Sequence, residues 1–84
     1  MWYRDKNHWR GNLGNCVAVL IPRAGGWYYR FEGIEKGRKW VTTDEGPYRS
    51  AYLAGLYAIE EAKLYDIDRR MIHQLSETLA ELVK

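Results

Sequence analysis

Residues 26–43 read GWYYRFEGIEKGRKWVTT, and this stretch decides the fold. Apolar and polar side chains alternate from Trp27 to Glu32, which is the period of a strand with one buried face. Lys36 and Gly37 follow as the centre of a two-residue hairpin turn, because glycine adopts the positive φ that such a turn requires. The sequence therefore predicts an antiparallel hairpin.

The returning strand is predicted over residues 39–43, and the length of the turn fixes its register. Gly33 then pairs with Trp40, and the glycine leaves room for the indole ring. One face of the hairpin is therefore aromatic and suited to a core. Its residues are Trp27, Tyr29, Phe31 and Trp40.

A third strand is predicted over residues 16–21, a β-branched run that ends at Pro22. The turn after Pro22 leaves its orientation open. An even loop puts Val17, Val19 and Ile21 on the face opposite the aromatic rings. An odd loop puts Cys16, Ala18 and Leu20 there instead.

Helix signals begin at Ser50, a good N-cap residue, and predict a helix over residues 51–65. One stripe of this helix carries small residues that allow close approach to the sheet. The stripe consists of Ala51, Gly55, Ala58 and Ala62. The opposite side carries Leu53, Leu56, Tyr57 and Leu64. Two apolar faces predict that a second element covers the outer side.

A second helix is predicted over residues 69–83, capped by Asp66 or Asp68. Its apolar residues repeat at a spacing typical of helix packing. They are Ile72, Leu75, Leu79 and Leu82. This seam can pack on the first helix within one chain, or it can form a two-fold dimer. We expect it to pack on the first helix and still leave apolar surface for a homodimer.

The predicted fold class is α+β, a three-stranded antiparallel sheet followed by two helices on one face (β-β-β-α-α). Residues 1–15 show no clean period and are interpreted as an aromatic and basic N-terminal arm, with a short strand around residues 2–4. Residues 16–84 form the single domain. No apolar run reaches the length of a membrane span, and the single cysteine, Cys16, permits no internal disulfide, so we expect a cytoplasmic protein.

No catalytic or metal-binding pattern is present in the sequence. His8 and His73 have no histidine or cysteine at helical spacing, and Cys16 lies in an apolar run, where a buried thiol is inert. We therefore expect no enzyme activity, no metal and no cofactor.

Charge and aromatic content point to a binding surface. Residues 1–49 carry nine basic and five acidic side chains, whereas residues 50–84 carry four and six. Tyr, Trp and Arg are the residues enriched in binding hot spots. The predicted partner-binding residues are Trp2, Tyr3, Arg4, Trp9, Arg10, Tyr28, Arg30, Arg38 and Lys39. A basic aromatic sheet face also suits single-stranded nucleic acid, which is the alternative hypothesis.

The order of a hairpin, a third strand and then Tyr48-Arg49-Ser50-Ala51 opening an Ala-rich helix resembles small proteins encoded by bacteriophages and other mobile elements, including anti-CRISPR proteins. The resemblance covers roughly residues 16–65 and rests on size and element order. It implies a non-enzymatic inhibitor that docks on a host nucleoprotein complex, such as a CRISPR effector, in the host cytoplasm.

Overall fold

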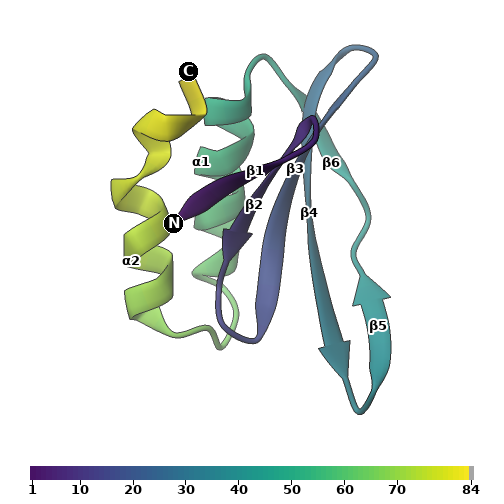
Figure 1. Ribbon diagram of the computed structural model, residues 1–84, viewed down its shortest axis with the longest axis vertical. Coiled ribbons are helices and arrows are strands. Elements are labelled where there is room, and N and C mark those ends of the chain that lie inside the picture. The colour runs from purple at the N-terminus through teal and green to yellow at the C-terminus, as the bar shows by residue number, and fades with distance from the viewer. Residues whose placement is uncertain (84) are drawn as a thin grey trace.

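The computed structural model describes residues 1–83 and shows an α+β fold (Figure 1). One antiparallel sheet carries its helices on a single face. The strands are β1 (Trp2–Asp5), β2 (His8–Asn12), β3 (Cys16–Arg23), β4 (Gly26–Glu35), β5 (Arg38–Val41) and β6 (Glu45–Tyr48). The helices are α1 (Ala51–Ala62), α2 (Arg69–Glu77) and a 3-10 helix, η1 (Leu79–Val83). The predicted class is confirmed, but over these residues the sheet has six strands instead of three.

Two of the three additional strands come from the segment interpreted as an arm, and the third lies between the predicted hairpin and the first helix. The sheet runs in the order β1-β2-β3-β4-β5, and β6 also pairs with β4. Trp2 pairs with Gly11, and a Cβ on Gly11 would lie 2.8 Å from the Trp2 ring. Residues 2–12 are therefore a hairpin built into the sheet. The short strand expected around residues 2–4 is present as β1, but the rest of this segment was interpreted as an arm. The β6 strand contains Gly46 and Pro47, two residues that usually interrupt a strand.

The predicted register of the central hairpin is confirmed. Gly33 pairs with Trp40, and a Cβ on Gly33 would lie 2.4 Å from the indole. The β3–β4 loop, which the sequence left open, is even, because Arg23 pairs with Gly26 across two residues. Val19 and its i±2 neighbours on β3 therefore lie on the face away from the helices.

The core lies between the sheet and the helices. The small-residue stripe of α1 is buried, as predicted, and packs with the aromatic face of the sheet. Gly55 allows η1 to pack closely against α1, since a Cβ at this position would lie 2.6 Å from the Leu82 side chain. Ser50 caps α1 by accepting a hydrogen bond from the Leu53 amide at 3.2 Å, and the helix ends at Ala62.

The second helix is shorter than predicted. Asp68 caps α2, and the α-helix stops at Glu77 because Thr78 leaves helical geometry and its hydroxyl donates to the Gln74 carbonyl at 2.8 Å. The chain then continues as the 3-10 helix η1. No helix within residues 1–83 combines the length and apolar composition that crossing a membrane requires.

The position of α2 corrects the prediction for the outer side of α1. The second helix lies beside α1 on the sheet (Figure 1), and the Trp2 indole N–H donates to the Leu75 carbonyl at 2.9 Å. Leu56 on the outer side of α1 therefore stays 36% exposed, and Leu64, in the connection that follows the helix, is 81% exposed. The four residues predicted as a dimer seam are buried within this one chain. Their exposed fractions are 6% for Ile72, 0% for Leu75, 7% for Leu79 and 5% for Leu82.

Candidate functional site

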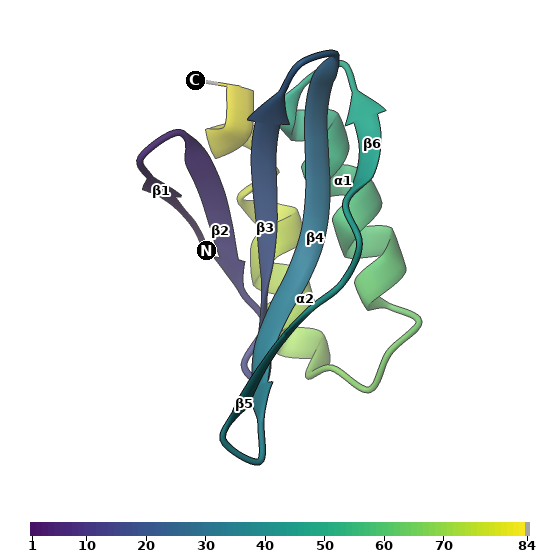
Figure 2. The same ribbon diagram turned by 90° about the vertical axis from the view of Figure 1, so that its right-hand side faces the viewer.

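The candidate site is the sheet face opposite the helices, which we call the open face. Figure 2 looks onto this side of the sheet, and no helix of the described chain covers it. Strand register aligns Tyr3, Arg10, Val19 and Arg30 across the four strands β1 to β4. The neighbouring rows of the open face contain Val17, Ile21, Tyr28, Glu32, Lys39 and Val41.

An apolar line along β3 forms the base of the open face. Val19 is 0% exposed and Ile21 is 4% exposed, although neither belongs to the core beneath the helices. Arg10 and Arg30 flank Val19 in register, and Tyr28 flanks Ile21. Long side chains cover apolar neighbours with their aliphatic stems while their charged ends stay at the surface. Arg10 and Arg30 therefore cover Val19 with their stems and present their guanidinium groups at the surface.

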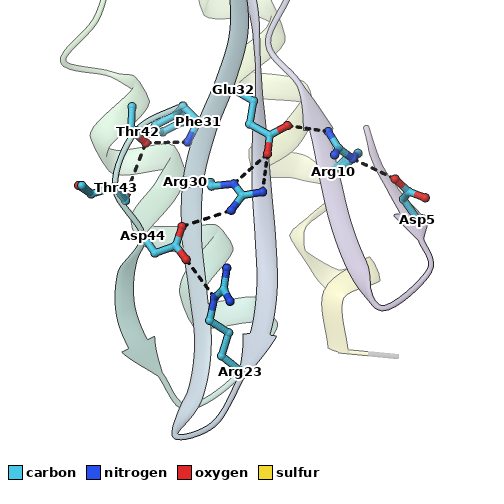
Figure 3. A network of polar contacts seen from close by, with 9 residues as sticks. All are labelled: Asp5, Arg10, Arg23, Arg30, Phe31, Glu32, Thr42, Thr43 and Asp44. Atoms are coloured by element: carbon cyan, nitrogen blue, oxygen red, sulfur yellow. Dashed lines mark hydrogen bonds and ion pairs between the residues drawn. The ribbon is translucent and has the colours of Figure 1, made fainter. Parts of the chain in front are cut away.

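Glu32 is the centre of an ion-pair network on this face (Figure 3). Its carboxylate accepts a hydrogen bond from Arg30 Nε at 2.8 Å and another from Arg10 Nη1 at 3.3 Å. Only 9% of the Glu32 side chain is exposed, against 23% for Arg30 and 25% for Arg10. Burial opposes ionisation, but the hydrogen bonds and charges of the two guanidinium groups outweigh it and hold the pKa of Glu32 below its ordinary value.

Two further carboxylates extend the network to either side (Figure 3). Asp5 accepts from Arg10 Nε at 3.1 Å near the β1–β2 turn. Asp44, which lies between β5 and β6, contacts Arg30 at 3.6 Å and Arg23 at 3.0 Å. The complete network links three arginines with three carboxylates, so its formal charge is zero. The positive charge expected on this face is therefore largely neutralised within the network.

The structure brings together five of the nine predicted partner-binding residues. Tyr3, Arg10, Tyr28, Arg30 and Lys39 share the open face.

The other four predicted residues lie elsewhere. Trp2 is 2% exposed and belongs to the core, so it offers no contact surface in this fold. Arg4 and Trp9 lie on the helix side of the β1–β2 hairpin, with the guanidinium 5.1 Å from the ring centroid. Arg38 lies at the end of the β4–β5 hairpin, in the same row as Glu35.

Sequence reasoning missed the network itself. Arg30 and Glu32 occupy alternate positions of one strand, which is a signal that their side chains share a face. No comparable signal exists for Asp44, because its place depends on the path of the chain from β5 to β6. Asp5 was assigned to the arm, and the turn that sets it beside Arg10 was not predicted.

Two observations on the described residues concern metal ligands and the single thiol. No three His, Cys, Asp or Glu side chains of residues 1–83 converge as metal ligands. Cys16 is buried, and burial raises the pKa of its thiol, which disfavours the reactive thiolate. The arrangement on the open face is suited to recognition by paired charges and tyrosine rings. Comparison of the chain with protein-family models, with curated proteins and with solved structures finds no match.

Proposed function

We propose that this chain is a small non-enzymatic binding protein that inhibits a host macromolecular complex by docking on it through the open face. One observation carries the proposal. An uncovered sheet face holds a half-buried, internally paired set of arginines and carboxylates beside exposed Tyr3 and Val41. Arginine and tyrosine surrounded by apolar contacts are the usual composition of a binding hot spot.

Preorganisation supports this proposal. Ordering a long side chain on binding costs about 0.5–1.5 kcal/mol. Arg10 and Arg30 are already held by Glu32, and about three-quarters of each side chain is buried. A partner that forms hydrogen bonds with the outer edges of these two guanidinium groups therefore binds side chains that are already held in place, and the cost of ordering them on binding is small.

The size of the molecule is adequate for such an interface. A standard protein–protein interface removes about 800 Å² from each partner. The principal extents of the chain are 34 × 25 × 23 Å, so one broad side can supply that area. The neutral, mixed-charge network favours a protein surface, which offers both donors and acceptors, over a run of phosphates.

Single-stranded nucleic acid is the alternative, and one observation favours it. The β4–β5 hairpin projects beyond the rest of the sheet (Figure 2). Lys36, Arg38 and Lys39 gather there next to Trp40, and all three cations are exposed. Phosphate contacts with a ring close by are typical of strand-binding proteins. Trp27, Tyr29 and Phe31 pack toward the helices, so Trp40 is the ring closest in sequence to these three cations, while Tyr3 and Tyr28 lie elsewhere on the open face.

Affinity capture with matched tyrosine variants tests the proposal. Tyr3 on the open face and Tyr57 of α1, whose ring stacks on Tyr48 on the helix side of the sheet, are each 50% exposed. Tyr3→Ala should abolish retention of a host complex that the wild-type chain captures, whereas Tyr57→Ala should retain it. Equal retention by both variants, or no complex captured by the wild type, would contradict docking through this face.

Two further measurements separate the alternatives. A complex that depends on phosphate contacts weakens steeply with salt. For a single strand, the logarithm of the binding constant falls by about 0.7 per neutralised phosphate for each tenfold rise in salt concentration. Binding through the open face should depend on salt much less. The resemblance to anti-CRISPR proteins is tested by adding the purified chain to a CRISPR effector and measuring target cleavage, which the chain should block if the effector is its partner.

A further inference from the structure

A second, separate site lies on the helix side of the sheet, where the α1–α2 connection meets the start of β3 (Figure 1). A hollow of about 350 Å³ opens to solvent there. Its volume falls at the lower end of the range of about 300–1,000 Å³ found for small-ligand pockets. The hollow shares no residue with the ion-pair network, so a ligand can occupy it whether or not the open face docks on a partner.

Three of the eight residues that line the hollow carry aromatic rings. Phe31 and Tyr65 meet edge to face, with centroids 6.1 Å apart and planes at 77°. Trp40 lies over Gly33, where a Cβ would come within 2.4 Å of the indole, so the glycine sets the depth of this side. Cys16 and Ile67 complete the apolar lining.

The rings are held in place before any ligand arrives. Phe31 is 3% exposed and is fixed in the core. The Tyr65 hydroxyl donates to Glu61 Oε2 at 2.8 Å, while Tyr29 donates to the other oxygen of the same carboxylate at 2.6 Å. A hollow with fixed walls loses little freedom when it is filled.

Asp66 supplies the carboxylate of the lining. The other polar groups are the Asn15 amide and the Thr42 hydroxyl, and the Thr42 oxygen already accepts the Phe31 amide at 2.9 Å. Lys63 and Arg69 line a neighbouring hollow that Asp66 also borders, but no ion pair joins either of them to Asp66 in residues 1–83. The carboxylate is therefore available to a cation.

We propose that this hollow binds an organic cation, an ammonium group attached to a compact apolar body. The electron-rich faces of phenylalanine, tyrosine and tryptophan attract cations, and quaternary ammonium groups are recognised in this way. The apolar lining accommodates the carbon atoms of the ligand. Asp66 supplies the opposite charge, which selects a cation over a neutral or anionic molecule of the same size.

Nuclear magnetic resonance titration of the full chain with benzyltrimethylammonium chloride tests the site. The cation should shift the indole signal of Trp40 and the ring signals of Phe31 and Tyr65. Benzyl alcohol should bind more weakly and benzoate more weakly still. Equal affinities for the three probes, or no shift at Trp40, would overturn the proposal.

Two variants and one control make the assignment specific. Asp66→Asn should weaken binding of the cation about two- to fivefold, as expected for a partly exposed charge pair, and should leave benzyl alcohol unaffected. Tyr65→Leu should weaken the cation similarly by removing one ring. Glu35→Gln, which removes an exposed carboxylate from the β4–β5 hairpin, should change nothing. Unchanged affinity of Asp66→Asn for the cation would contradict the proposal that the Asp66 carboxylate recognises its charge.

Discussion

Replacing Glu32 with glutamine should destabilise the protein, because two guanidinium groups then lose their shared counter-charge. Glutamine keeps the shape and one acceptor, so the change isolates the charge. Breaking a fully buried pair costs about 3–5 kcal/mol, and a surface pair contributes about 0–1 kcal/mol. The Glu32 side chain is 9% exposed and its partners are 23% and 25% exposed, which places this network between the two limits.

We therefore expect a loss of about 1–3 kcal/mol in the free energy of unfolding. For a domain of this size, a loss of 1 kcal/mol lowers Tm by about 4–8 °C. Thermal and urea unfolding followed by circular dichroism measure the change directly. Glu35→Gln is the matched control on the same strand, since Glu35 is exposed and forms no ion pair within the described chain, and it should stay within about 0.5 kcal/mol of wild type.

A double-mutant cycle with Arg30→Met separates the ion pair from other effects. The two changes should be non-additive by about 0.5–3 kcal/mol, as for residues in one network. If Glu32→Gln changed stability no more than Glu35→Gln, or if the cycle closed additively, the network would not hold the open face and the reasoning from its geometry would be wrong.

The remaining predictions concern pH, packing and assembly. The pKa of Glu32 is held below its ordinary value of 4.5. The stability that ionised Glu32 contributes is therefore complete above about pH 4.5 and is lost as pH falls through the lower pKa of the folded state. Urea unfolding between about pH 6 and pH 3 should show this loss in the wild type and a smaller loss in Glu32→Gln. Ala58, which is 0% exposed against the sheet, should not accommodate a larger side chain, and Ala58→Leu should cost about 1–3 kcal/mol in thermal unfolding. Leu79 is buried within the chain, so Leu79→Glu should abolish the circular dichroism signal of folded protein; light scattering that showed a folded dimer become a folded monomer would instead support the dimer predicted from the sequence.

The central hairpin and the packing of α1 could be predicted because local signals determine them. Lys36 and Gly37 fix the turn, Gly33 accepts the Trp40 ring, and the small residues of α1 match the large rings of the sheet. Each of these features depends on residues close in sequence or on one strong periodicity.

A short strand was expected around residues 2–4, where β1 lies, but β2 and β6 could not be predicted, because their local sequence argues against them. Lys6 takes a positive φ of 58° in the β1–β2 turn, a conformation for which glycine is the usual signal. Pairing with β4 accommodates Gly46 and Pro47 in an edge strand, although both weaken a strand in isolation. The ion-pair network was missed for a related reason, since Asp44 reaches Arg23 and Arg30 only after β6 has returned alongside β4.

Blocking the open face with a bulky label is the most direct test of the proposed docking surface. Val41 on the open face and Leu64 in the α1–α2 connection are 57% and 81% exposed, and the native Cys16 is buried. A maleimide fluorophore can therefore be attached at Val41→Cys or Leu64→Cys, and binding to the captured host complex measured by fluorescence anisotropy or competition. The label at position 41 should abolish binding and the label at position 64 should leave it unchanged. Binding that survives the label at position 41, or that is lost only with the label at position 64, would contradict docking through the open face.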